Sequence, residues 1–340
     1  MRAREAEVFD LGYQRYTGPR EGRNRARLAL FENGVRTVLG IGRGGRAKIL
    51  PVGLFLAVMI PAVVFVIILA FIGEGGADFI PGPADYYSIV SVILIIFGAI
   101  MAPELLCPDR RDNVLPLYLV RPLTSNDYLI ARFLAFFAIV LVLVYAGQIV
   151  LQAGLILTAS DQVEYIRDNW QDVPRILFMG VLIATFISVG PLAVAAFTTR
   201  RAYAAAFVIA AWLLLNSISD GLTVETSCTI VTTGDRGGDA IIEESSFEVG
   251  STIIPEEEVV SRECTRPAGD LAPYVGLLHL GGVTDNINNM VFDVDLEPGQ
   301  GAPSSMAVAE LHDAFPIGVY VLWTGIPALL LWHRYRRIRL

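Results

Sequence analysis

Residue patterns that carry out enzyme chemistry are absent from this sequence. Its only lysine, Lys48, lies between Ala47 and Ile49, so the chain lacks the Gly-x-x-x-x-Gly-Lys-Ser/Thr loop whose lysine reaches nucleotide phosphates. The nucleophile motif Gly-x-Ser-x-Gly and the zinc motif His-Glu-x-x-His are missing too. We therefore predict no catalytic residue in this chain.

One motif resembles a metal site. Asp293-x-Asp295-x-Glu297 has the acidic spacing that begins a calcium-binding loop. Pro298 stands where that loop requires glycine for a sharp turn. We predict no metal site and no cofactor bound by this chain.

The composition indicates a membrane protein. Of the 340 residues, 54% are hydrophobic and 18% are charged, and the mean hydropathy is +0.54. Soluble domains carry about 25% charged residues, so a soluble enzyme and a disordered chain are both disfavoured. About 20 apolar residues cross a bilayer as a helix. Six uncharged stretches are long enough: Ile49–Ile72, Tyr86–Pro103, Phe133–Ser160, Ile176–Thr199, Ala202–Ser219 and Ala314–Trp332.

Basic residues set the expected orientation of these spans. With six spans, 21 of the 26 Lys and Arg residues fall on the side of both termini, and 25 of the 34 acidic residues fall on the opposite side. Because cytoplasmic loops are enriched in Lys and Arg, we expect both termini in the cytoplasm. The fold class predicted is an all-α polytopic membrane protein with six transmembrane helices. The net charge of −8 argues against nucleic-acid binding.

The cytoplasmic start of the chain, residues 1–48, contains two parts. Residues 1–27 read as an irregular basic arm, and two interpretations stay open: an interfacial strip among lipid headgroups, or a docking segment for a cytosolic partner. Residues 28–41 have the apolar spacing of an amphipathic helix lying on the membrane surface. The helix is defined by Leu28, Phe31, Val35, Val38 and Leu39, with Arg36 on another face.

The cytoplasmic loop 104–132 mixes charge and apolar residues. Cys107–Asn113 is predicted as a polar turn, Val114–Val120 as a short apolar element, and Ser125 or Asn126 as the cap of the next helix. Such an element can be merely interfacial, or it can be a lever that transmits force from a cytosolic motor.

Two motifs resemble a known family. Asp10-Leu11-Gly12-Tyr13-Gln14-Arg15-Tyr16, followed by Gly18-Pro19-Arg20, is similar to the start of prokaryotic export-type (ABC-2-like) ABC transporter permeases. Leu117-Tyr118-Leu119-Val120-Arg121-Pro122-Leu123-Thr124, followed by Asp127-Tyr128-Leu129, is similar to their segment between spans two and three. Ala131-Arg132 stands where that family often has Gly-Lys. The resemblance covers most of the chain except about 221–270.

The resemblance implies a complex with cytosolic ATPases. Two permease subunits, here expected to be identical, would dimerise, and each would bind one ABC ATPase subunit that holds ATP and Mg. The interfacial helix (Leu28, Phe31, Val35, Arg36) and a coupling helix at about 108–123 would dock on the ATPase. The implied coupling residues are Asp109, Arg110, Arg111, Asp112, Leu117, Tyr118, Arg121 and Pro122.

The segment 220–313 is expected to be an extracytoplasmic insertion. Thr226–Val231, Ala240–Val249 and Ser251–Ile254 have the composition of short strands, and Leu271–Val283 could form a short helix on the membrane surface. Cys228 and Cys264 both fall here, and two cysteines in an oxidising compartment predict a disulfide.

The spans hold uncharged polar residues with two possible roles. These residues are Ser88, Ser91, Gln148, Gln152, Asn216 and Ser217. They can form hydrogen bonds between helices, or they can line a path for an amphipathic substrate.

The predicted organisation has four parts: 1–48, the cytoplasmic arm and interfacial helix; 49–219, spans one to five; 220–313, the insertion; and 314–340, span six with a basic tail. The function expected is the permease subunit of an ATP-driven exporter in a prokaryotic plasma membrane. The alternative is a membrane-anchored receptor or scaffold whose extracytoplasmic part binds a partner.

Overall fold

The structure is a computed structural model. It describes Gly18 and residues 22–42, 44–72, 81–119, 123–225, 227–231, 242–245, 261–294 and 302–336. Several predictions lie outside these residues: most of the arm 1–27, Arg121 and Pro122, Ser251–Ile254, and the positions Asp295, Glu297 and Pro298.

In the part of the chain that the structure describes, six long helices form the body of the protein, which confirms the predicted set of apolar spans. Each is long and apolar enough to cross a membrane. They are α2 (Arg46–Ile72), α3 (Pro83–Arg111), α5 (Ser125–Thr158), α7 (Asp172–Ala195), α8 (Arg201–Thr223) and α12 (Ala314–Arg336). Because lipid offers no partners to an open backbone, helices of this length satisfy their own hydrogen bonds across the apolar layer.

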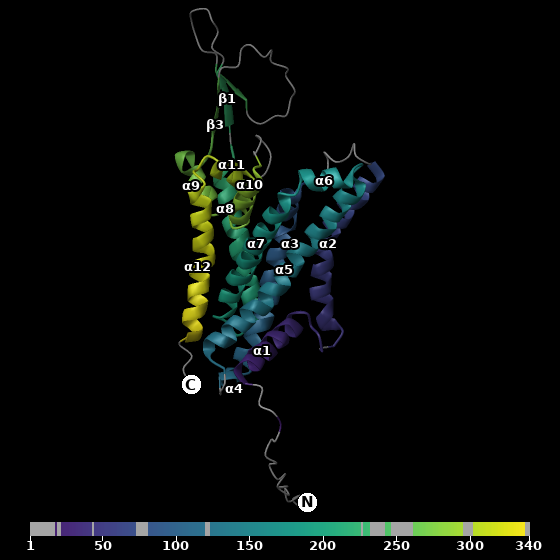
Figure 1. The fold of residues 1–340 in the computed structure, drawn as a ribbon. Coiled ribbons are helices and arrows are strands. Elements are labelled where there is room, and N and C mark those ends of the chain that lie inside the picture. Colours follow the sequence, from purple (N-terminus) through teal and green to yellow (C-terminus); the bar gives the residue numbers. More distant parts are fainter. Residues whose placement is uncertain are drawn as a thin grey trace, which may run out of the picture.

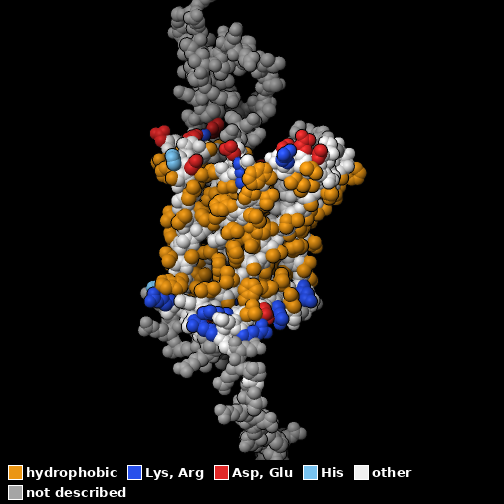
Figure 2. Space-filling model, in the orientation of Figure 1, with side chains coloured by type: hydrophobic (Ala, Val, Ile, Leu, Met, Phe, Trp, Pro, Cys, Tyr) orange, Lys and Arg blue, Asp and Glu red, His pale blue; other side chains and the backbone are white. Residues whose placement is uncertain are grey.

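Three helices are central and three are peripheral. About half or more of the most apolar stretch of α3, α5 and α7 is buried, whereas less than a fifth of that stretch is buried in α2, α8 and α12. Figure 1 shows α2 and α12 on opposite flanks of the bundle. Exposed apolar helix faces are what a lipid surrounding requires. Figure 2 shows the result as a wide hydrophobic band between two polar ends.

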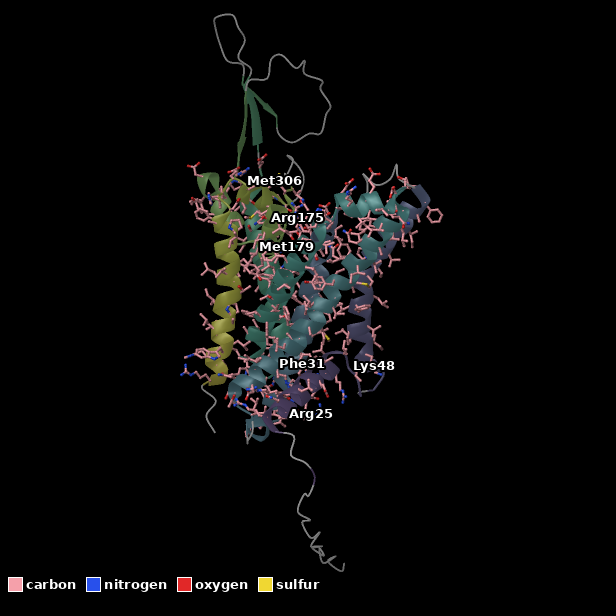
Figure 3. The ribbon with its side chains drawn as sticks, viewed as in Figure 1. Arg25, Phe31, Lys48, Arg175, Met179 and Met306 are labelled. Carbon is pink, nitrogen blue, oxygen red and sulfur yellow. The ribbon has the colours of Figure 1, made fainter. Side chains whose placement is uncertain are left out.

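The two ends of the bundle carry opposite charge. Arginine and lysine side chains gather at the end where α1, α4 and the last turn of α12 lie, and acidic side chains gather at the other (Figures 1 and 2). We call these the basic end and the acidic end. Figure 3 places Arg25, Phe31 and Lys48 at the basic end and Met306 near the acidic end.

The helices approach each other closely at glycines. A Cβ atom at Gly147 of α5 would lie 1.7 Å from the Tyr86 hydroxyl of α3, and one at Gly180 of α7 would lie 2.1 Å from the Tyr145 ring. The buried Tyr86 hydroxyl donates to the Val58 carbonyl of α2 at 2.8 Å. Because Gly147 has no side chain, Tyr86 of α3 can contact both α5 and α2 in the apolar layer.

Helix α3 is longer than predicted: Cys107–Arg111, expected in a polar turn, belong to the helix, and the turn is confined to Asp112 and Asn113. The helix continues through Arg111 because Leu105, Leu106 and Cys107 are fully buried against the bundle. The chain reverses two residues later at Asn113, whose φ of 52° is in the left-handed region that asparagine tolerates.

Two short helices lie at the basic end. α1 (Gly22–Val38) begins earlier than predicted and packs mainly on α5, while α4 (Leu115–Leu119) connects α3 to α5. The apolar face predicted to lie on the membrane surface is divided: Val38 is buried together with Leu30 and Gly34, whereas Leu28 is 48% exposed. A Cβ at Gly34 would lie 2.7 Å from that of Ala135, so the glycine lets α1 seat directly on α5.

A cap of short helices covers the acidic end. It contains α6 (Gln162–Asp168), the 3-10 turn η2 (Gly269–Leu271), α9 (Ala272–Gly276), α10 (Gly282–Phe292) and α11 (Pro303–Val308). Hydrogen bonds attach it to the long helices: Asn288 donates to the Ala84 carbonyl at 2.8 Å, and Ser219 donates to the Val275 carbonyl at 3.0 Å.

Between α8 and η2 the chain forms a three-stranded antiparallel sheet. The strands are β1 (Ser227–Val231), β2 (Ile242–Ser245) and β3 (Ser261–Thr265), in the order β2-β1-β3. The register pairs Cys228 with Cys264. Residues directly opposite each other in such a pair share one face of the sheet.

The fold shifts the pKa values of two side chains in the cap, Asp285 and His279. Burial raises the pKa of Asp285 from 3.8 to about 6, although a hydrogen bond with Ser88 lowers it in part. Burial lowers the pKa of His279, against the opposing effect of Asp220. The His279 Nδ1 accepts from the Gly282 amide at 2.5 Å and its Nε2 lies 3.3 Å from Asp220, as expected for a neutral ring.

The raised pKa of Asp285 predicts that the cap loses stability as pH rises. Because the folded-state pKa of Asp285 exceeds the ordinary value, its contribution is fully present below about pH 4 and is lost as pH rises through about 6. His279, with its lowered pKa, acts in the opposite direction, losing stability as pH falls. We expect the melting temperature to fall between about pH 4 and pH 6, and the fall to shrink in Asp285→Asn. An unchanged pH dependence in that variant would contradict the assignment.

Candidate functional site

A buried charged cluster joins four helices at the basic end. We call it the Arg132 cluster; its members are Asp109 (α3), Tyr118 (α4), Tyr128 and Arg132 (α5), and Tyr335 (α12). Arg132 is 2% exposed, and its Nη2 donates to the Asp109 Oδ2 at 2.6 Å. The Tyr128 hydroxyl donates to the same oxygen at 2.7 Å. A single carboxylate oxygen thus holds α3 and α5 together.

Aromatic rings extend this cluster to α4 and α12. The guanidinium of Arg132 lies 5.9 Å from the Tyr118 ring and 5.5 Å from the Tyr128 ring, both within cation–π range. The Tyr335 ring stacks on Tyr128 at 5.6 Å. Burial also raises the pKa of Tyr118. The short helix α4 is therefore fixed to a residue that three spans share.

The cluster is incompletely satisfied. Among the described residues, the Arg132 Nε and Nη1 and the Tyr335 hydroxyl are buried and have no hydrogen-bond partner. An unpaired buried donor costs about 1–3 kcal/mol. Three buried polar atoms of the cluster are therefore unpaired at the place where the chain reverses between α3 and α5.

A second cluster anchors α1. The Asp127 carboxylate, 5% exposed, accepts from both Arg23 and Arg27 at 2.6 Å. It also completes a capping box with Thr124, whose amide donates to Asp127 at 2.9 Å. Thr124 is the N-cap of α5, so the prediction of Ser125 or Asn126 as the cap is wrong. The Thr124 hydroxyl accepts from the Asp127 amide, which neither predicted residue does.

The end of α3 also holds the turn between α7 and α8. Arg110 donates to the carbonyls of Ala196 and Thr198, and Glu104 forms an ion pair with Arg201. The buried Cys107 thiol lies 3.8 Å from the Ala195 carbonyl. The last two turns of α3 thus contact both α5 and the turn between α7 and α8.

The structure divides the predicted coupling residues into two groups. Asp109, Arg110 and Tyr118 hold the bundle together. Arg111 and Asp112 pair with each other at 2.9 Å and are 61% and 53% exposed, so they offer charge to a partner. Leu117 lies in α4, and its side chain is outside the described part of the chain, as are Arg121 and Pro122.

The predicted path residues do not form one lining. Gln148 donates to the Pro83 carbonyl, Ser91 donates to Ser88, and Asn216 accepts from the Gly281 amide at 3.4 Å. Ser217 is exposed, and the Gln152 amide nitrogen is buried without a partner among the described residues. Gln148 and Asn216 thus connect helical segments, as one of the two interpretations predicts, whereas Ser91 bonds within α3.

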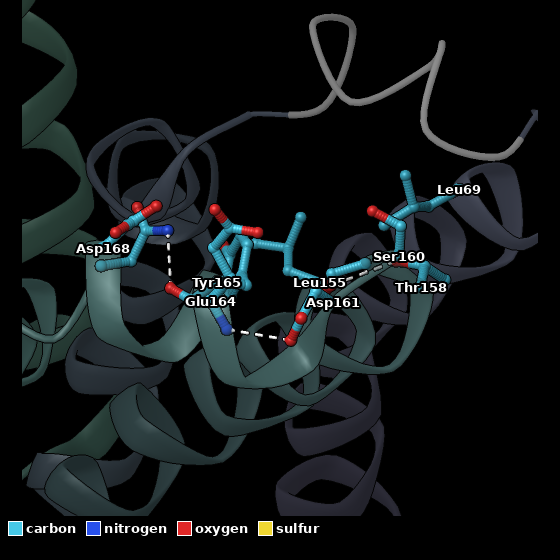
Figure 4. A pocket seen from close by; sticks show the side chains of 10 residues that line it. Leu69, Leu155, Thr158, Ser160, Asp161, Glu164, Tyr165 and Asp168 are labelled. Carbon is cyan, nitrogen blue, oxygen red and sulfur yellow. Dashed lines mark hydrogen bonds between the residues drawn. The ribbon is translucent and has the colours of Figure 1, made fainter.

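A hollow at the acidic end is lined by carboxylates. The cavity of about 290 Å³ lies between the end of α5 and α6, and Asp161, Glu164 and Asp168 are on its wall (Figure 4). The Asp161 carboxylate accepts from the amides of Val163 and Glu164 and so caps α6. Within the described ranges, no group of three or more His, Cys, Asp or Glu side chains could hold a metal ion.

Several residues of the site were missed from sequence. Arg23 and Arg27 lay in the segment read as irregular, although their spacing of four places both on one helix face. Asp127, three residues after Thr124, was a usable capping-box signal. Tyr335 gave no local signal, because its role arises only where α12 crosses α5.

Comparison with known proteins leaves the family open. No protein-family model matches the chain, and no curated protein is significantly similar to it. The function must therefore be argued from the residues and their arrangement.

The buried pair predicts an asymmetric mutational effect. Asp109→Ala leaves Arg132 charged in a dry site, so we expect the free energy of unfolding in detergent to fall by about 3–5 kcal/mol. Adding Arg132→Met removes the stranded charge and should restore most of the loss. Asp112→Ala, at an exposed pair of the same helix end, serves as control and should unfold like the parent. A double variant as unstable as the single one would contradict this account.

Proposed function

We propose that this chain is the membrane permease subunit of an ATP-driven exporter of the ABC-2-like class. Two copies would form the translocation path, and each would bind a separate ATPase subunit at the basic end. This proposal gathers the sequence resemblance, the six apolar helices and the short helix between the second and third of them.

The observation that carries the proposal is the attachment of α4. Tyr118 holds this helix against Arg132, which pairs with Asp109 of α3 and contacts Tyr128, and Tyr128 stacks on Tyr335 of α12. A displacement of α4 therefore reaches three spans through buried contacts. A helix that only rested on the interface would have no need of such a connection.

A docking surface for the ATPase lies beside α4. Arg111, Asp112, Asn113 and Pro116 are all exposed there. α1 completes the surface, since it is anchored to α5 through Asp127. The chain has no nucleotide-binding loop of its own, so we expect ATP and Mg to be bound by the partner.

The proposed orientation follows from charge. The basic end carries α1, α4 and the last turn of α12, and positively charged ends face the cytoplasm. We therefore propose a multi-pass protein of the prokaryotic plasma membrane with cytoplasmic termini. The cap and the sheet would lie outside.

Purification from native membranes tests the coupling proposal. We expect the tagged chain to bring down a P-loop ATPase in a two-to-two complex, and the chain alone to hydrolyse no ATP. Arg111→Glu should weaken assembly because it reverses an exposed charge; Arg175→Glu, near the acidic end, is the matched control (Figure 3). Arg110 is a poorer probe because its bonds to two carbonyls hold the fold.

The outcome also separates the two functional hypotheses. A chain that purifies without any ATPase, while a partner binds its sheet and cap, would favour the receptor or scaffold. Assembly that withstands Arg111→Glu would remove this residue from the docking surface.

We also propose a disulfide between Cys228 and Cys264. Their direct pairing in the β1–β3 register supports it, because opposed residues of antiparallel strands have Cα atoms about 4.5–5.5 Å apart, within the range of disulfides. We expect intact mass to rise by two hydrogens on reduction, and trypsin to cut the insertion faster afterwards. Cys107, buried in α3, is the internal control and should stay reduced. Two free thiols in the untreated protein would contradict the proposal.

A further inference from the structure

An apolar groove opens on the flank of the bundle between α8 and α12. Its volume is about 450 Å³, and α7 forms its floor. The side chains around it are aliphatic or aromatic, with glycine and proline between them, including Phe197, Phe207, Leu215, Trp323 and Leu330. Among the described residues no charged group lines it.

Along α8, the groove is about as long as one leaflet of a bilayer is thick. From Phe207 to Leu215, α8 rises about 12 Å, close to half of a hydrocarbon core about 30 Å thick. Leu280, from the turn between α9 and α10, lines the groove as well, and Asn216 contacts the neighbouring Gly281. The groove thus runs from the basic end toward the cap.

A cation stands at the basic mouth of the groove. The guanidinium of Arg334, exposed in the last turn of α12, lies 5.9 Å from the ring of Phe197, which itself lines the groove. Arg200 is the N-cap residue of α8, the helix whose Phe207 and Leu215 line the groove. An apolar slot with positive charge at its entrance is complementary to an anionic headgroup that carries a hydrocarbon tail.

We propose that this groove binds one acyl chain of an anionic phospholipid from the leaflet at the basic end, with the phosphate beside Arg334. The volume is that of a small-molecule site, whereas a spanning helix of a second copy is several times larger. This inference goes beyond the proposed function, because it holds for a receptor or scaffold as well as for a permease.

The floor of the groove provides a selective blocking variant. A Cβ at Gly190 of α7 would meet nothing within 4 Å, so Gly190→Leu fills the groove without a clash at its first atom. Gly53 of α2 is equally open and lies outside the groove, which makes Gly53→Leu the matched control. For the charge, Arg334→Gln is compared with Lys48→Gln. Lys48 lies in the first turn of α2 at the same end, across the bundle from α12 (Figures 1 and 3).

The test uses the full chain in phosphatidylcholine vesicles that contain a photoactivatable phosphatidylglycerol, with the reactive group in its acyl chain. Cross-linked peptides are identified by mass spectrometry. We expect the peptides of α8 and α12 to be labelled well above those of α2. Gly190→Leu should reduce the α8 label to the α2 level, and Arg334→Gln should lower the preference over photoactivatable phosphatidylcholine about fivefold.

Three outcomes would overturn the proposal. They are equal labelling of α2 and α8 in the parent, labelling of α8 that survives Gly190→Leu, and an equal response to Arg334→Gln and Lys48→Gln. An α8 label that disappears as the protein-to-lipid ratio is raised would assign the groove to an interface between copies of the chain. None of these results depends on an ATPase being bound.

Discussion

The pairing of one buried arginine with one carboxylate organises the basic end. Arg132 cannot be left uncompensated in a dry site, so Asp109 has to reach it, and this requires α3 to remain helical through its last turn. Once Asp109 is in place, Arg110 faces the turn between α7 and α8, and Arg111 faces outward. Asp109 and Arg110 thus make contacts inside the protein, while Arg111, the next residue around the helix, lies on the exposed surface.

The long helices and the charge difference between the two ends could be predicted from the sequence. Long uncharged runs identified all six helices, and the charge distribution separated the two ends. The sequence was insufficient where the determining contact joins distant segments. Gly34 packs on Ala135, and Tyr335 packs on Tyr128, so neither role has a local pattern. The polar residues after Cys107 were read as a turn, because burial of one helix face by the α7–α8 turn is invisible in the sequence.

The distribution of buried residues among the long helices suits a lipid environment. The central helices carry the glycines and tyrosines that bring backbones together, and the peripheral helices present aliphatic side chains outward. Packing, rather than exclusion of water, must therefore hold α3, α5 and α7 together within the lipid layer. The groove beside α8 is a place where that packing is left open, and Gly190 and Pro191 contribute to its floor.

The anchoring of α1 has a consequence for the order in which the protein is made. Arg23 and Arg27 precede Asp127 by about one hundred residues, and two spans are synthesised between them. α1 is therefore synthesised well before the carboxylate that fixes it. Arg23 and Arg27 are already present when Asp127, at the start of α5, is made. The attachment of α1 is completed only with the third span, so a chain truncated before that point retains α1 without it.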